Sequence, residues 1–97
     1  MTRNDALELL KSHQDEMQRQ FGVRTLAVFG SVARDQAGPD SDLDVLVAFE
    51  GRPRFHPFMR LKSYLEVLFG VRVDLVTWNS VRPEMRPQIE REAVYVS

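Results

Sequence analysis

Three short apolar runs limit what this chain can fold into, because each has the length and composition of a β-strand. The runs are Leu26–Phe29, Val45–Val47 and Val71–Val76. Glycine, proline and helical patterns separate them, so the β-α-β-α-β order predicts a mixed α/β fold with helices against a small mixed sheet. The predicted strands cover about residues 24–29, 43–49 and 72–77, with a last short strand at 93–96.

The first helical pattern lies near the N-terminus. It begins at a predicted capping box formed by Thr2 and Asp5, and Gly22 is its predicted end. Its apolar face is predicted from helical spacing at Ala6, Leu9, Leu10, His13 and Met17. The sequence therefore predicts one helix over most of the first 21 residues.

Three more helices are predicted further along the chain. A short one covers about Ser31–Arg34, directly after the first strand. A longer amphipathic helix begins near Pro57 and ends before Gly70. The last helical stretch reaches about residue 92, and Pro87 must break, kink or restart it.

Composition narrows the function classes. The 97 residues predict a single domain, 1–97, and the apolar fraction of 43% supports a small core. We expect a cytoplasmic protein, because no apolar run approaches twenty residues and the N-terminus lacks a signal-peptide pattern. Without cysteine there are no disulfides or thiolate metal sites, and the net charge of −1 argues against direct nucleic-acid binding.

Aspartates on the predicted strands are the main candidates for chemistry. Asp42 and Asp44 alternate at the start of the second strand, so both carboxylates can aim at one point. Asp74 interrupts the third strand, which we expect to be internal in the sheet, and could join them from a neighbouring position. Clustered carboxylates repel each other unless a hard cation such as Mg²⁺ neutralises them. Two such ions can clamp the attacking and leaving oxygens of a nucleotidyl transfer.

The Gly30-Ser31 turn is the second candidate. A glycine after a strand lets the backbone approach a ligand closely, and free N–H groups at a helix start favour phosphate. Arg34 lies one helical turn later and could also reach phosphate oxygens. Taken alone, the Gly30-Ser31 pair is explained more simply by an ordinary strand-to-helix turn with Ser31 as N-cap. Arg34 could instead cap a helix or pair with Asp35 or Asp40.

Structural alternatives also stand beside the aspartates. Asp42 and Asp44 could simply be solvated, and Arg72 shares a predicted face with Asp74 and could pair with it. Trp78 and Tyr95 are expected to be core or partner-surface aromatics rather than platforms for base stacking. The basic loop at residues 51–54 is expected to be solvated, with a patch beside the site as the alternative.

Gly30–Arg34, followed after a short gap by Ser41–Asp44, resembles the signature of the minimal nucleotidyltransferases in the DNA polymerase β nucleotidyltransferase superfamily. Asp74 matches the third aspartate, and residues 89–96 resemble the closing helix and strand. The resemblance implies a mixed sheet flanked by helices, with Mg²⁺ and a nucleoside triphosphate at the carboxylates. It implies the following roles: triphosphate or nucleotide binding for Gly30, Ser31, Arg34 and Ser41, metal binding for Asp42, Asp44 and Asp74, and activation of the incoming hydroxyl by Asp74.

The smallest members of this family are similar to antitoxins that are encoded beside HEPN-domain RNase toxins. In that family the antitoxin can transfer AMP from ATP to a tyrosine of the toxin. We expect the same function here, with the acceptor surface supplied by a partner or by an oligomer of the chain, because 97 residues leave little room for a substrate domain. Two alternatives are an antitoxin that neutralises its toxin by occlusion and a transferase that acts on a small hydroxylated molecule.

Overall fold

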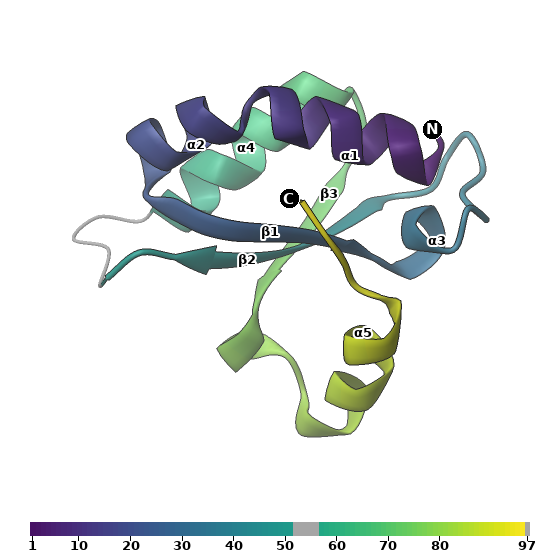
Figure 1. The fold of residues 1–97 in the computed structure, drawn as a ribbon. Helices are drawn as coiled ribbons and strands as arrows, with labels where there is room; N and C mark the ends of the chain where they lie inside the picture. The colour runs from purple at the N-terminus through teal and green to yellow at the C-terminus, as the bar shows by residue number, and fades with distance from the viewer. Residues whose placement is uncertain (52–56, 97) are drawn as a thin grey trace.

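A four-stranded mixed sheet organises the chain in a computed structural model that describes residues 1–51 and 57–96 (Figure 1). The strands lie in the order β3-β2-β1-β4. Strand β1 is antiparallel to β2 and to β4, whereas β2 and β3 are parallel. The strand bounds are β1 Val23–Phe29, β2 Leu43–Phe49, β3 Val73–Thr77 and β4 Val94–Tyr95.

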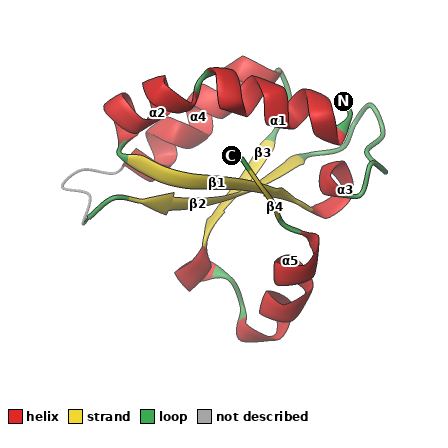
Figure 2. Cartoon of the chain, viewed as in Figure 1, coloured by secondary structure: helices red, strands yellow, loops and turns green. Residues whose placement is uncertain are grey.

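The helices divide between the two faces of the sheet, as Figure 2 shows. Helices α1, α2 and α4 cover one face, and α5 with two short 3₁₀ turns lies on the other. The short α3 follows β1 directly at one end of the sheet. The helix bounds are α1 Arg3–Ser12, α2 Gln14–Phe21, α3 Gly30–Ala33, α4 Pro57–Phe69 and α5 Arg86–Glu92, and the 3₁₀ turns are η1 Trp78–Ser80 and η2 Pro83–Met85.

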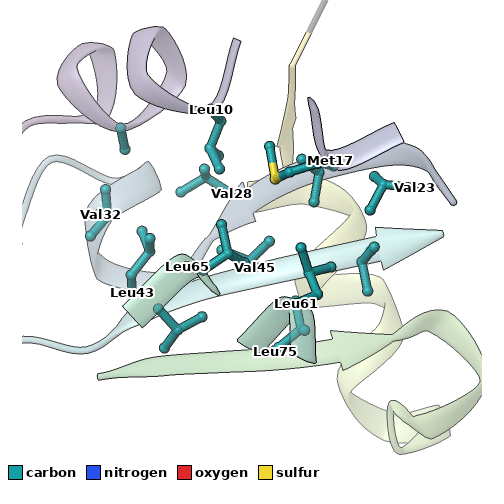
Figure 3. Close-up of a cluster of buried hydrophobic side chains, with 14 of the residues drawn as sticks. Leu10, Met17, Val23, Val28, Val32, Leu43, Val45, Leu61, Leu65 and Leu75 are labelled. Carbon is teal, nitrogen blue, oxygen red and sulfur yellow. The ribbon is translucent and has the colours of Figure 1, made fainter. Parts of the chain in front are cut away.

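The face under α1, α2 and α4 carries the main core (Figure 3). Alternate residues of β2 point into it, and Leu43 and Val45 are fully buried. Leu61 and Leu65, four residues apart on α4, meet them from the helix layer. The two periodicities, two in the strand and 3.6 in the helix, thus give a closed apolar layer.

The opposite face has a much smaller apolar cluster. Its buried members are Ala27, Leu46, Val81 and Ile89, and partly buried side chains including Trp78 pack against it. Because side chains alternate along β2, Asp44 and Leu46 belong to this face while Val45 belongs to the main core. We call it the α5 face below.

The structure confirms the predicted mixed fold and corrects two details, the continuity of the N-terminal helix and the position of β3 in the sheet. The N-terminal helix is broken at His13, whose backbone N–H bonds to Leu10 at 3.2 Å while its ring bonds to the Leu9 carbonyl at 3.0 Å. The last helical stretch restarts at Pro87 as predicted, because η2 ends at Met85 and Pro87 lies in the first turn of α5, where a proline is tolerated. Strand β3 is an edge strand, whereas the sequence analysis predicted an internal one.

Within residues 1–51 and 57–96, none of the helices has the length and apolarity needed to cross a membrane. The predicted capping box of Thr2 and Asp5 is present, and Gly22 ends α2 in the left-handed conformation. The arginines of the basic loop, Arg52 and Arg54, lie outside the described residues, so the alternatives for that loop stay open.

Candidate active site

Strand register brings two of the predicted carboxylates side by side. Asp44 of β2 pairs with Asp74 of β3 in the parallel part of the sheet, and paired residues share a face. Asp42 lies two residues before Asp44, at the entrance to the same strand. The other neighbour of Asp44 is Phe29, its partner on β1. Asp44 and Asp74 therefore lie side by side on the α5 face, and Asp42 lies next to them at the entrance to β2.

The carboxylates interact through their charges. The pKa of Asp44 is raised to about 6, mainly by burial and then by the negative charges of Asp74 and Asp42, while Arg34 acts in the opposite direction. A pKa perturbed by burial together with like charges is typical of functional sites. The site thus accumulates negative charge that a bound cation would relieve.

The structure does not pre-form a complete metal cage. Among the residues that it describes, no three His, Asp or Glu side chains are arranged to hold a metal ion. Asp42 is engaged by Arg72, with 3.3 Å between Oδ1 and Nε, and Asp74 is exposed on the edge strand. The donor set still fits Mg²⁺, because carboxylate oxygens are its preferred ligands and their mutual repulsion favours a cation.

The Arg72 contact also settles one structural alternative. The sequence allowed Arg72 to pair with Asp74, but the guanidinium reaches Asp42 instead. Both partners are largely solvent-exposed, so this ion pair holds Asp42 only weakly.

Gly30 is required by the position of Asp44. Its φ is +71°, in the left-handed region that favours glycine, and a Cβ built on it would overlap Oδ2 of Asp44. The sequence analysis linked this glycine to close approach of a triphosphate. The structure adds a requirement from within the protein, since the Asp44 carboxylate packs where a side chain at position 30 would lie.

Ser31 lies in the first turn of α3, beside Gly30, and is partly buried. Its place at the end of β1 puts it near the start of β2, because the two strands are antiparallel and Phe29 pairs with Asp44. N–H groups in a first helical turn have no intrahelical acceptor. The predicted role of Gly30 and Ser31 in holding phosphate remains a prediction.

Arg34 does not pair with Asp35 or Asp40. Its guanidinium forms an ion pair with Glu92 of α5, with 2.6 Å between Nη1 and Oε1, while Asp35 contacts Arg3. This contact ties α3 to α5 across the end of the sheet. Arg34 therefore stands beside the carboxylates but is already neutralised by Glu92.

Glu92 is the site residue that the sequence analysis missed. Burial would raise its pKa, but hydrogen bonds from Gln88 and Arg34, the charge of Arg34 and the Gly30 backbone together lower it. It also adds a small repulsion to Asp44. The resemblance of residues 89–96 to a family tail was the available signal, although that likeness assigned no role to this glutamate.

Ser41 has a structural role in the loop before β2. Its hydroxyl accepts a hydrogen bond from the Gly38 backbone N–H at 2.9 Å, and its own N–H donates to the Gly38 carbonyl at 3.2 Å. These bonds close the turn that leads into Asp42. The predicted contact between Ser41 and a nucleotide remains a prediction.

Comparisons with known proteins agree with this geometry. Residues 10–96 match the family described as "Nucleotidyltransferase domain". The protein adenylyltransferase MntA of Thermococcus cleftensis is 43% identical over 96 residues, which span 99% of this chain and 97% of that protein. A solved structure described as a minimal nucleotidyltransferase has a TM-score of 0.78 and 41% identity, and covers 97% of this chain and 95% of that one.

A more distant structure shares the fold alone. It is a tri-AMPylated HEPN toxin of Shewanella oneidensis in complex with its MNT antitoxin. The matched chain has a TM-score of 0.64 and 17% identity, over 94% of this chain and 71% of that one.

Proposed function

The chain belongs to the nucleotidyltransferase domain family, as a minimal nucleotidyltransferase, and from that premise we propose that it transfers AMP from ATP to a protein hydroxyl. Support comes from the protein adenylyltransferase of Thermococcus cleftensis, whose likeness extends over nearly the full length of both chains. The observation that carries the proposal is the pairing of Asp44 with Asp74 beside Gly30, with Asp42 close enough for its charge to act on Asp44.

In the proposed reaction the acceptor oxygen attacks the α-phosphorus of ATP. A new P–O bond forms, the bond between the α- and β-phosphates breaks, and pyrophosphate leaves. The hydroxyl proton passes to a base, and we assign Asp74 to orient and activate that hydroxyl because it is an exposed carboxylate next to Asp44. Gly30 and Ser31 would hold the departing phosphates at the start of α3.

Asp42 and Asp44, with Asp74, would hold Mg²⁺ in the working enzyme. The ion would supply charge neutralisation at the phosphates when bound. The protein's own contribution is to keep Asp44 close to the other two carboxylates, which the sheet register and the packing against Gly30 both achieve. Binding would require Asp42 to leave Arg72, a change that an exposed ion pair opposes only weakly.

We further propose that the acceptor is a tyrosine of a HEPN-type RNase toxin encoded beside this protein. The support is indirect. The structure from Shewanella oneidensis combines an AMP-modified HEPN toxin with an MNT antitoxin of the same fold as this chain. The acceptor residue must reach the exposed edge strand β3, where Asp74 lies, so a partner would approach the α5 face from that edge.

The test is the mass of the neighbouring gene product after incubation with this protein, ATP and Mg²⁺. We expect a gain of one or more adenylate units, absent with the Asp42→Ala/Asp44→Ala variant. The Asp40→Ala variant is the matched control, since Asp40 is an exposed loop aspartate on the same approach to β2. A partner that stays unmodified with the wild-type protein would overturn the proposal.

One observation favours a second function, neutralisation of the toxin by binding alone. The ion pairs Arg72–Asp42 and Arg34–Glu92 satisfy site residues without any ligand, so these charges can also serve the structure. In that case the double variant would still form a stable complex with the toxin and inhibit it fully. A stoichiometric complex with no adenylate on the toxin would identify this function.

A further inference from the structure

The α5 face has a cavity beside the carboxylates. Its volume is about 320 Å³, and its lining residues are Leu46, Trp78, Glu90, Ala93 and Tyr95. That volume lies at the lower end of the range usual for small-molecule sites. Neither the comparisons nor the roles assigned above account for this cavity.

The register of the sheet places the cavity next to the carboxylates along the direction of β2. Leu46 lies two residues beyond Asp44 on β2, about 7 Å along the strand and on the same face. Leu46 pairs with Ala27, and Ala27 pairs in turn with Tyr95 of β4. The row that contains Asp44 and Asp74 is therefore followed by a row that forms the cavity floor.

Two aromatic side chains border this space. Tyr95 is 57% exposed, and Trp78 is partly buried at the end of β3. The guanidinium of Arg86 lies 5.6 Å from the centre of the Trp78 ring, within the distance of a cation–π interaction. Trp78 packs against the small apolar cluster, in agreement with the expectation of a core or partner-surface aromatic, and both Trp78 and Tyr95 also line this cavity.

The carboxylate of Glu90 limits the kinds of ligand that the cavity could bind. Glu90 is exposed at the rim, and an ionised carboxylate can only accept hydrogen bonds. It therefore suits a ring that carries an amino group, as adenine does at N6. An aromatic ring with a polar edge also matches a site made of aromatic faces and one acceptor.

We propose that this cavity binds the adenine base of the donor nucleotide. With the triphosphate at Gly30 and Ser31 and the α-phosphate at the aspartates, the base would extend over Leu46 and stack on Trp78 or Tyr95. Glu90 would accept a hydrogen bond from N6 and so select adenine over a base with a carbonyl at that position. This inference rests on the proposed function, because it assumes that the carboxylates take ATP.

The experiment compares ATP, ITP and inorganic tripolyphosphate, each with Mg²⁺, by calorimetry and by tryptophan fluorescence. Trp78 is the only tryptophan in the chain, so its emission reports on the cavity directly. We expect ATP to change the emission and tripolyphosphate to leave it unchanged while still binding. We also expect Tyr95→Ala to weaken ATP about tenfold and to leave tripolyphosphate unchanged, whereas Tyr95→Phe keeps wild-type affinity.

Base selection gives a second readout that does not depend on stacking. The wild type should prefer ATP to ITP, and Glu90→Gln should remove that preference, since an amide can donate to the carbonyl of hypoxanthine. Glu84→Gln is the control, because Glu84 is equally exposed but does not line the cavity. Thermal unfolding of each variant confirms that it is folded.

Failures of the two proposals look different. If neither ATP nor tripolyphosphate binds, the proposed function fails and this inference fails with it. If ATP binds but the Trp78 emission, the Tyr95→Ala affinity and the ATP preference all stay unchanged, only the base site is wrong. If Tyr95→Ala leaves ATP binding intact but raises the KM for the acceptor protein, the cavity receives the acceptor, which also overturns the inference.

Discussion

The two faces of the sheet carry different kinds of side chain. Under α1, α2 and α4, fully buried side chains such as Val45 and Leu61 pack against one another without polar interruption. On the α5 face only a small apolar cluster is buried, and Asp44 and Asp74 lie next to it. Adjacent residues of one strand, Asp44 and Val45, thus lie in different surroundings, a group of like charges on one side and an apolar core on the other.

This contrast shows how a small domain can hold repelling charges. The free energy of folding comes mainly from the apolar face, which leaves the α5 face free to hold groups that destabilise the protein without a ligand. Substitutions on the two faces should therefore differ in what they damage.

The largest effect is expected at Gly30. Gly30→Val places a side chain where Oδ2 of Asp44 lies and strains a residue with positive φ, so transfer should fall about 100-fold or more. Gly22→Val is the control, because Gly22 has the same φ of +71° but a Cβ there meets nothing within 4 Å. Both variants are compared by adenylate transfer and circular dichroism. Equal transfer in the two variants would contradict the role of Gly30 beside Asp44.

Substitutions in the apolar face under α1, α2 and α4 should lower the free energy of unfolding. Leu61→Ala removes a fully buried side chain, so the free energy of unfolding should fall by about 2–5 kcal/mol in urea titrations. Met59→Ala on the same helix should change it by no more than about 0.5 kcal/mol, because Met59 is 57% exposed. A small effect of Leu61→Ala would mean that the main core is not where the structure places it.

Replacement of the Asp44 carboxylate should change stability in the opposite direction. Because the pKa of Asp44 rises from 3.8 in the unfolded chain to about 6 in the fold, stability is lost as pH rises between these values. Asp44→Asn should therefore raise the free energy of unfolding by about 1 kcal/mol at pH 7.5 in EDTA, since partial exposure weakens the full linkage effect. The gain should vanish near pH 4. A gain that is constant across this pH range would have another cause than the Asp44 charge.

The smallest effect is expected at Arg72. Its ion pair with Asp42 is exposed, so Arg72→Gln should change the free energy of unfolding by less than about 0.5 kcal/mol. Lys62→Gln is the comparison variant, because it also removes one positive charge but lies on α4, on the other face of the sheet. A loss above 1 kcal/mol for Arg72→Gln alone would show that the α5 face contributes more to stability than we infer.

Local patterns in the sequence predicted most of the fold. Strand alternation predicted that Asp42 and Asp44 share a face, and the Pro57-to-Gly70 pattern matches α4 closely. The break at His13 escaped prediction because it depends on the ring of one residue competing for a backbone carbonyl. The edge position of β3 also escaped, since it depends on which strands pair, and local patterns do not encode that.

The site was predictable where alternation and motif spacing define it, as for Asp42 and Asp44. Contacts between residues far apart in the chain were not predictable. Glu92 reaches Arg34 across 58 positions, and Arg72 pairs with Asp42 because β3 lies parallel beside β2. The cavity at Tyr95 depends likewise on the pairing of β4 with β1. A strand of only two residues gives no local pattern from which that pairing could be predicted.

The most direct test of this account is the stability difference between the wild type and Asp44→Asn, measured in EDTA and again with saturating Mg²⁺ and ATP. We expect the variant to be the more stable protein in EDTA and the wild type to be the more stable one with the ligands, because only its carboxylate cluster binds them tightly. A wild type that is already the more stable protein in EDTA, or an order that Mg²⁺ and ATP leave unchanged, would contradict the claim that these carboxylates are held together for a ligand.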